Sequence, residues 1–330
     1  MRTELKCIAL EALGVLRVQG PDLVSFLQGQ LSSDVARLTE AHSLLGGYHN
    51  PQGRVIALLR LVRCAPEEIL AVLPRELVAT VAHRLMRYVL RSRVKLADAT
   101  PDFRVSGLVA AGPQPPAAGS RAAPSLPAPS LPASSLPATL DGAARLADSI
   151  AVCVALQPAR WLLLTPTGSP LPIACAAAGA EEWQRLAVSA GEPQVYAATS
   201  EEFVAQMLNL DLIGAIAFDK GCYTGQEVIA RAHYRGRVKR RLQRFVTDAA
   251  LPLAPGDALV VSGGRAVRIV DSAALEDGRR EFLAVAPLAA ESPGEAPAES
   301  PDAAAAPPTA VRPTAVRALP LPYALPAEYT

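Results

Sequence analysis

One short segment of the chain concentrates the residue types that could do chemistry. Residues 218–244 read FDKGCYTGQEVIARAHYRGRVKRRLQR. Gly221 and Gly225 bracket Cys222, which predicts a tight loop around this cysteine, and Lys220 lies two residues before it. A nearby positive charge favours the thiolate, which is the nucleophilic and metal-ligating form of cysteine. Cys222 is therefore a candidate reactive thiol.

A helix is predicted directly after this loop. Thr224 and Glu227 have the spacing of a capping box, so the helix is expected to start near Gly225 and to end near His233. The exposed amides of its first turn would also favour a thiolate at Cys222. The carboxylate of Glu227 would oppose this effect if it faced the sulfur.

Positive charges accumulate downstream of the cysteine. Between 231 and 244 the basic residues are Arg231, Arg235, Arg237, Lys239, Arg240, Arg241 and Arg244, with no acid among them. A solvated helix face normally mixes both signs. The run therefore favours a site for anions, either RNA phosphates or the carboxylates of a ligand. Aromatic residues make up only 5% of the chain, which disfavours base stacking on single-stranded RNA.

Composition limits the class of protein. The chain has 330 residues, 50% of them hydrophobic, and a net charge of +1, which excludes global disorder and a chain-wide polyelectrolyte. No apolar run reaches the length of a membrane span, and the N-terminus lacks the apolar core of a signal peptide, so we predict a cytoplasmic protein without a membrane segment. The five cysteines include no CxxC spacing. We predict free thiols and no resident metal site, with Cys7, Cys64, Cys153 and Cys175 inert.

Two segments differ sharply from the rest of the chain. Residues 113–139 contain 8 prolines, 7 alanines and 5 serines, and repeat Ser-Leu-Pro-Ala every five residues. Residues 290–317 contain 6 prolines and 9 alanines, and repeat Pro-Thr-Ala-Val-Arg twice. Such repeats bury too little apolar surface to offset chain entropy. Both are predicted to be disordered insertions, with a docking role for the repeats as the alternative.

The remaining sequence predicts a mixture of helices and strands. Strands are expected at 7–18, 54–63, 69–73, 103–110, 149–156 and 160–165. Helices are expected after Pro21, after Pro74, from Glu181 to Ala190, and from a capping box at Thr199 and Glu202 to about Leu208. After residue 241 the pattern is all-β, with strands at 258–262, 265–270 and 281–288, a Gly263-Gly264 hairpin, and a short edge strand at 319–325.

The candidate loop and several other stretches resemble one protein family. Lys220-Gly221-Cys222-Tyr223-Thr224-Gly225-Gln226-Glu227, followed by Arg231, resembles the signature of the YgfZ family, which is related to the aminomethyltransferase (T-protein) of glycine cleavage. Further similar stretches are Gly20-Pro21-Asp22, Phe26 to Leu31 with Asp34, Asn50 to Arg54, Glu202 to Leu210, and Leu321-Pro322-Tyr323. The resemblance extends over nearly the whole chain outside the two insertions.

The resemblance implies a fold. The expected class is α+β, with three domains in a ring: two interleaved folate-binding α+β domains over 1–112 and 140–240, and a C-terminal antiparallel β-barrel over 241–289 and 318–330. The two insertions, 113–139 and 290–317, would interrupt this arrangement.

The resemblance also implies a function. Family members bind tetrahydrofolate and support assembly, maintenance or repair of iron–sulfur enzymes, including enzymes that modify tRNA. Catalytic roles would fall on Cys222 and Lys220, and folate contacts on Asn50, Gln206, Asn209, Tyr223, Gln226, Glu227 and Arg231. The expected partners are iron–sulfur client enzymes, any cluster would be transient and shared with a partner, and the protein is expected to be a monomer.

Two alternatives remain open at the level of sequence. A folate-dependent one-carbon transferase of the aminomethyl type would need acidic residues that the T-protein uses, but the corresponding positions here are Ala57, Leu58 and Ser189. An RNA-binding module would use the basic run at 231–244 and would not need Cys222. The sequence does not decide whether any substrate is turned over.

Overall fold

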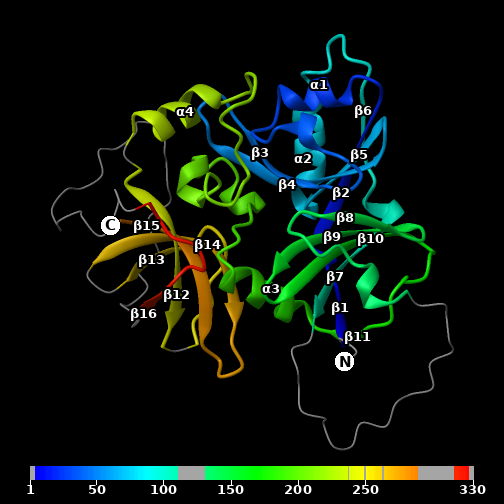
Figure 1. The fold of residues 1–330 in the computed structure, drawn as a ribbon. Helices are drawn as coiled ribbons and strands as arrows, with labels where there is room; N and C mark the ends of the chain where they lie inside the picture. Colours follow the sequence, from blue (N-terminus) through cyan, green and yellow to red (C-terminus); the bar gives the residue numbers. More distant parts are fainter. Residues whose placement is uncertain are drawn as a thin grey trace, which may run out of the picture. The chain divides into compact units, whose positions relative to one another are not determined.

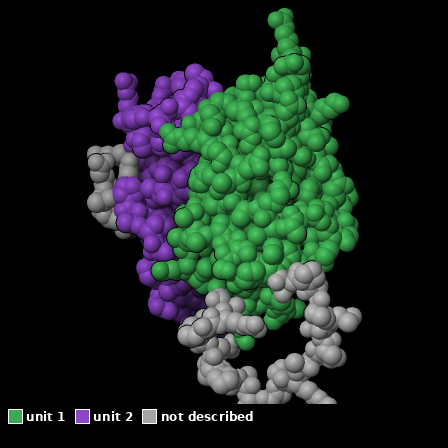
Figure 2. Space-filling view, turned by 45° about the vertical axis from the view of Figure 1, so that its right-hand side comes forward, with its two compact units in different colours: residues 1–46, 59–183 green, residues 47–58, 184–330 purple. Residues whose placement is uncertain are grey.

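The chain forms two compact units, each made of two separate stretches of sequence. The computed structural model describes residues 4–110, 131–236, 238–248, 250–261, 264–288 and 316–326. Unit 1 comprises residues 1–46 and 59–183, and unit 2 comprises residues 47–58 and 184–330 (Figure 2). The structure is mixed α and β with strands in the majority, which confirms the α+β prediction.

A six-stranded sheet forms the lower part of unit 1 in Figure 1. Its order is β11 (Ala176–Ala178), β1 (Leu5–Ala9), β7 (Phe103–Ala110), β10 (Ala159–Pro166), β9 (Ser149–Leu156) and β8 (Ala143–Leu146). The predicted strands at 103–110, 149–156 and 160–165 are confirmed. One face packs around Leu108, Leu163 and Ile173.

A second sheet has the order β3 (Leu44–His49), β4 (Val55–Ala65), β5 (Glu68–Pro74), β2 (Leu13–Gln19) and β6 (Lys95–Asp98). Two helices belong to the same region, α1 (Leu23–Gln28) and α2 (Arg75–Met86). Helix α2 packs on β2, β5 and β6, and buries Leu77, Val78, Val81 and Leu85 as the sequence predicts. Pro74 directly precedes the helix, where its missing N–H is not needed.

The predicted single strand at 7–18 is wrong, because the segment forms two strands. A turn at Glu11 separates β1 from β2, closed by the bond from Leu13 N to Leu10 O at 3.0 Å. Strand β1 pairs with β7, whereas β2 pairs with β5 and β6. The alternation of apolar residues continues through the turn, so the local pattern could not show that the two halves join different sheets.

The third sheet lies in unit 2 and is antiparallel. Its order is β13 (Ala258–Val261), β14 (Arg265–Ala274), β15 (Arg280–Pro287), β12 (Arg240–Thr247) and β16 (Val316–Leu319). The predicted pairing across the Gly263-Gly264 hairpin is confirmed for β13 and β14, although Ser262 and Gly263 lie outside the described residues. No pairing of β13 with β16 occurs among the described strands, so the closed barrel and the three-domain ring remain predictions.

The predicted edge strand at 319–325 is displaced. The strand β16 lies earlier, at Val316–Leu319, where it pairs with β12 at the edge of the sheet. Pro320 and Pro322 follow it, and proline has no N–H to donate to a ladder. The chain therefore leaves the sheet and brings the Tyr323 hydroxyl to Gly191 O, at 2.8 Å.

Two of the helices predicted after residue 180 are confirmed, and one is not. Helix α3 (Ala180–Ser189) ends before Gly191, whose φ of +68° is readily adopted by glycine. Helix α4 (Gln226–Tyr234) is described with the site below. The predicted helix from Thr199 to Leu208 is wrong: only short 3-10 turns form, at Ala197–Thr199 and Ala205–Leu208. Between them the backbone pairs with the start of β4 through Val55 N to Phe203 O at 2.8 Å.

Part of the first Pro/Ala/Ser segment is described. Residues 131–139 include a short 3-10 turn, Ala133–Ser135, and the buried side chain of Leu136. The indole nitrogen of Trp161 donates to Pro137 O at 2.8 Å. Residues 113–130 and 290–315, on which the rest of the disorder predictions fall, lie outside the described residues.

Candidate functional site

In the loop before α4, one side chain is exposed to solvent and the next one is buried. Cys222 is exposed, whereas Tyr223 is only 7% exposed. The helix begins at Gln226, with Gly225 as its N-cap residue, so the predicted position of the helix is confirmed. No side chain caps it, and the predicted capping box of Thr224 and Glu227 is therefore wrong.

The backbone conformation at the start of α4 requires glycine at position 225. Its φ is +83°, and a Cβ atom here would lie 2.6 Å from Asn50 O and 3.0 Å from the Cα atom of Gly53. Gly53 also has a positive φ, +72°, and faces Val228 of α4. The loop at 50–53 therefore packs directly against the beginning of α4, and only glycine fits at the closest point.

Asn50 holds the shape of that loop. Its Oδ1 atom accepts hydrogen bonds from the backbone N–H groups of Gln52 and Arg54, both at 3.0 Å, and its Nδ2 atom donates to Glu201 at 2.9 Å. The guanidinium of Arg54 in turn donates to Glu202 O at 2.6 Å. Both ends of the Asn50 amide are thus hydrogen-bonded within the protein, and a folate contact at Asn50 stays a prediction.

Lys220 and Tyr223 lie together. The Lys220 ammonium is 5.1 Å from the centroid of the Tyr223 ring, a cation–π arrangement. Burial raises the pKa of Tyr223 to about 12, so its phenol is protonated at neutral pH. The predicted positive charge near Cys222 is therefore held over a neutral aromatic ring.

His49 lies beneath the same loop and was not anticipated as a site residue. It is 1% exposed, and its ring centroid is 6.3 Å from that of Tyr223. Among the described residues, neither ring nitrogen has a hydrogen-bond partner of normal geometry. Burial lowers the pKa of His49 to about 3, opposed in part by the Gly53 backbone, so the ring is neutral at pH 7. The only signal in the sequence was its position directly before Asn50.

Gln206 and Asn209 are both buried, with different surroundings. Gln206 donates to Ile229 O in α4 at 2.7 Å, while its Oε1 atom has no hydrogen-bond partner among the described residues. Asn209 bonds to Leu242 O at 3.0 Å and to the Tyr323 hydroxyl at 3.3 Å, and accepts from Arg241 at 3.2 Å. The Oε1 atom of Gln206 thus has no hydrogen-bond partner among the described residues, whereas both the Nδ2 and the Oδ1 atoms of Asn209 are hydrogen-bonded.

The remaining predicted contacts lie on α4. Gln226 is half-buried at the first helical position. Glu227 and Arg231 form an ion pair of 3.5 Å on a solvent-exposed face, with side chains 88% and 74% exposed. The structure therefore brings Lys220 and Tyr223 together, and leaves Cys222, Glu227 and Arg231 exposed.

The basic run at 231–244 is not one open surface. Arg241 is buried and makes two hydrogen bonds to Asp211, at 2.9 and 3.0 Å. Arg244 forms an ion pair with Glu281. These two arginines are therefore not available to an external anion, which corrects the prediction for them. Arg231, Arg235 and Lys239 are exposed, and Arg237 lies outside the described residues.

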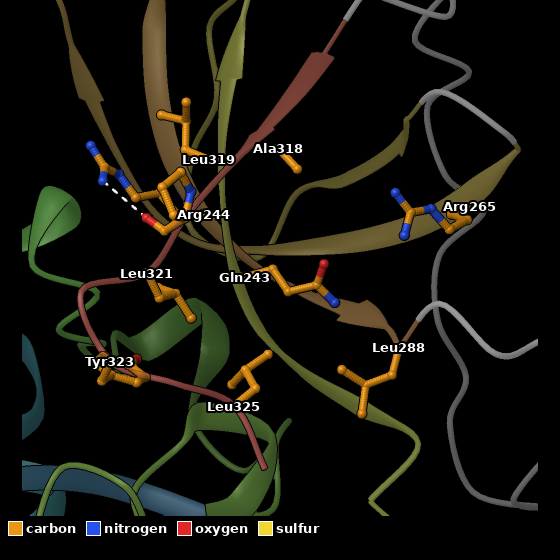
Figure 3. A pocket seen from close by; sticks show the side chains of 10 residues that line it. Gln243, Arg244, Arg265, Leu288, Ala318, Leu319, Leu321, Tyr323 and Leu325 are labelled. Carbon is orange, nitrogen blue, oxygen red and sulfur yellow. Dashed lines mark hydrogen bonds between the residues drawn. The ribbon is translucent and has the colours of Figure 1, made fainter. Parts of the chain in front are cut away.

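A pocket in unit 2 is lined by Arg244 of the basic run and by Tyr323, whose hydroxyl contacts Asn209. It has a volume of about 440 Å³, and its wall is largely apolar, with Leu319, Leu321 and Leu325 among the lining side chains (Figure 3). Arg244 closes one side by donating to Pro320 O at 3.2 Å. None of the residues predicted for catalysis or folate contact lines this pocket.

Two further searches of the described residues gave no site. No group of three or more His, Cys, Asp or Glu side chains is close enough to hold a metal ion in the described part of the chain. No described helix is long and apolar enough to cross a membrane.

Comparison with known proteins defines the fold. No protein-family model matches the chain. The solved structure of the glycine cleavage system aminomethyltransferase T from Bartonella henselae is similar, with a TM-score of 0.64, 14% sequence identity, and coverage of 87% of this chain and 80% of that chain. The chain therefore has a fold of the aminomethyltransferase type.

A heterotetrameric sarcosine oxidase from Corynebacterium sp. U-96 also matches, over 49% of this chain and 75% of that chain, with a TM-score of 0.29 and 12% identity. This likeness is too low to support an argument. The finer resemblance to the YgfZ family stays a prediction.

Proposed function

We propose that this protein binds tetrahydrofolate and uses Cys222 to support the assembly, maintenance or repair of iron–sulfur enzymes, including enzymes that modify tRNA. The observation that carries the proposal is the exposure of Cys222 in a loop held at the start of α4. The fold of the aminomethyltransferase type supports the folate part of the proposal. We further propose that the protein acts in the cytoplasm as a monomer.

The residues around α4 fit a folate in two respects. The buried Oε1 atom of Gln206 is an acceptor without a partner among the described residues, and a pterin ring presents N–H donors. The exposed cations Arg231, Arg235 and Lys239 are of the right charge for the carboxylates of a glutamate tail. When bound, the folate would supply a one-carbon carrier, while the protein residues bind and orient it.

Aminomethyl transfer is disfavoured by the residues at three positions. Ala57 is fully buried in β4, and Leu58 is 4% exposed, so neither offers a carboxylate. At the third position, the Ser189 hydroxyl donates to Glu281 at 2.9 Å, and Glu281 is already paired with Arg244. An accessory role with a reactive thiol therefore fits these residues better than a transferase.

An iron–sulfur cluster would be cargo and not a resident group. A [4Fe–4S] cluster needs about four thiolate ligands. Cys222 is the exposed member of the cysteines in the described residues, and it can supply one ligand. A cluster at this loop would therefore be shared with a client enzyme, which supplies the other ligands.

The test replaces the thiol in a cell that depends on this protein. Cys222→Ala should abolish the activity of iron–sulfur client enzymes and leave the melting temperature unchanged, because the side chain is exposed. Cys64→Ala is the matched control and should retain full complementation. Full client activity in the Cys222→Ala strain would contradict the role given to this thiol.

A further inference from the structure

Two other cysteines of the chain meet in unit 1. Strands β1 and β11 pair in parallel, with Cys7 opposite Ala177. Cys175 is the residue directly before β11, two positions from Ala177 and therefore on the same side of the chain as Ala177. The two side chains therefore lie on the same face of neighbouring strands, where the two thiols interact electrostatically.

The surroundings of the pair are apolar on one side and polar on the other. Both cysteines pack against the core cluster that contains Leu5, Leu108 and Ile173, and both are partly exposed. The Ser106 side chain and the charge of Arg104 both lower the pKa of Cys7. Both thiols are thus partly accessible to a small solute.

The interaction between the two thiols makes their pKa values unequal. It lowers the pKa of Cys7 to about 7, helped by Ser106 and Arg104 and opposed by burial. It raises the pKa of Cys175, whose thiol also lies 3.7 Å from Ile173 O. Cys7 is therefore the thiolate of the pair, and Cys175 stays a protonated thiol.

We propose that Cys7 and Cys175 form a redox-active thiol pair that is oxidised to an intramolecular disulfide by exchange with a small-molecule disulfide such as glutathione disulfide. This site is independent of the proposed function, and it replaces the expectation that both cysteines are inert.

The exchange takes two steps and balances. The Cys7 thiolate attacks one sulfur of glutathione disulfide, forms a mixed disulfide, and releases one glutathione thiolate. That thiolate takes the proton of Cys175, and the new Cys175 thiolate attacks the Cys7 sulfur. The Cys7–Cys175 bond forms as a second glutathione leaves and is protonated from solvent. Counted from the thiolate–thiol pair, the protein loses two electrons and one proton. With one further proton from solvent, one glutathione disulfide becomes two glutathione thiols.

The remaining cysteines differ from this pair. Burial raises the pKa of Cys64 to about 12 and also raises that of Cys153, so both stay protonated. Cys222 is exposed and would take up glutathione, but it lies in unit 2 and its sequence neighbours include no second cysteine. Exchange that ends in an intramolecular disulfide is therefore expected at Cys7 and Cys175.

The experiment uses the full chain with Cys222→Ser, which removes the exposed thiol. The reduced protein is treated with glutathione disulfide, and its intact mass is measured. We expect a loss of two hydrogen atoms, reversed by a dithiol reductant. Trypsin should then yield a cross-link between peptides 7–17 and 161–185, each of which contains one cysteine.

Single replacements in the same background separate the two roles. Cys175→Ser should stop at the first step and carry one glutathionyl group on Cys7, whereas Cys7→Ser should remain unmodified. Cys64→Ser is the matched control and should still lose two hydrogen atoms. The proposal would be overturned if the folded Cys222→Ser protein kept its mass, or if the disulfide mapped to another pair of cysteines. The peptide map of the Cys222→Ser protein alone decides this, even if a second replacement prevents folding.

Discussion

At the scale of single residues, the site depends on the contrast between Cys222 and its neighbour. Tyr223 is buried and carries Lys220 over its ring, whereas the Cys222 side chain is exposed. A buried aromatic side chain fixes the backbone on which the exposed thiol is presented. The thiol is thus held on an ordered loop and remains accessible to a partner.

His49 makes the stability of the fold depend on pH. Its pKa is lowered from 6.5 to about 3, so the unfolded chain binds one more proton than the folded chain between these pH values. The free energy of unfolding should therefore fall as pH is lowered from 6.5 towards 3, by up to about 1.4 kcal/mol per pH unit for one proton. Above pH 6.5 this residue should have no effect on the slope.

His49→Leu tests this statement in urea unfolding at pH 7, 6 and 5. The variant should lose less stability than the unmodified chain on acidification, because it removes the titrating group. At pH 7 it should be about as stable or more stable, since an unpaired buried polar group is replaced by an apolar one. Parallel pH dependence of the two proteins would show that His49 is not buried in neutral form.

At the scale of elements, the start of α4 requires glycine at position 225, because the loop at 50–53 lies directly against it. Gly225→Ala should lower the free energy of unfolding by about 1–3 kcal/mol, because its φ of +83° and the contact with Asn50 O both exclude a Cβ atom. Urea unfolding measures the change. Gly221→Ala is the matched control: its Cβ atom would meet nothing within 4 Å, so the change should stay within about 0.5 kcal/mol. Equal effects at the two positions would contradict the packing of loop 50–53 against α4.

The arginines of the basic run at 231–244 include buried, paired residues and exposed residues. Arg241→Ala should cost about 3–5 kcal/mol, because it leaves the buried Asp211 carboxylate without its partner. Arg231→Ala should cost at most about 1 kcal/mol, since its pair with Glu227 is exposed. Thermal unfolding of the two variants measures the difference. If Arg241→Ala lowered the free energy of unfolding by less than about 1 kcal/mol, the structural role of Arg241 would be contradicted, and it would again be a candidate for anion binding.

The elements also show which features the sequence could predict. The position of α4 follows from local signals, the glycines around Cys222 and the helical pattern that follows them. Its cap does not, because the conformation of Gly225 depends on Asn50, which is 175 residues earlier in the chain. The burial of His49 and the pairing of Arg241 with Asp211 are likewise long-range results of packing.

At the scale of the whole molecule, local pattern and long-range pairing contribute differently. The α+β class and most strands follow from alternation and turn residues. The split of residues 7–18 between two sheets does not, because both halves alternate alike. The alternation at 319–325 also suggested a strand, but a pattern of side chains says nothing of the missing N–H groups at Pro320 and Pro322.

The whole chain also relates the fold to its proposed ligand. A TM-score of 0.64 at 14% identity defines the fold and leaves the ligand to experiment. All of the predicted folate contacts belong to unit 2. Unit 2 is made of two stretches that residues of unit 1 separate in the sequence. Ligand binding therefore has to be measured on the full chain.

The most direct measurement is calorimetric titration of tetrahydrofolate into the reduced full-length protein under anaerobic conditions. The proposed function predicts saturable binding to one site, weakened by Gln206→Leu, which removes the free acceptor, and unchanged by Cys64→Ala. An absence of binding heat at millimolar tetrahydrofolate, with the protein folded, would contradict the central claim that this fold holds a folate.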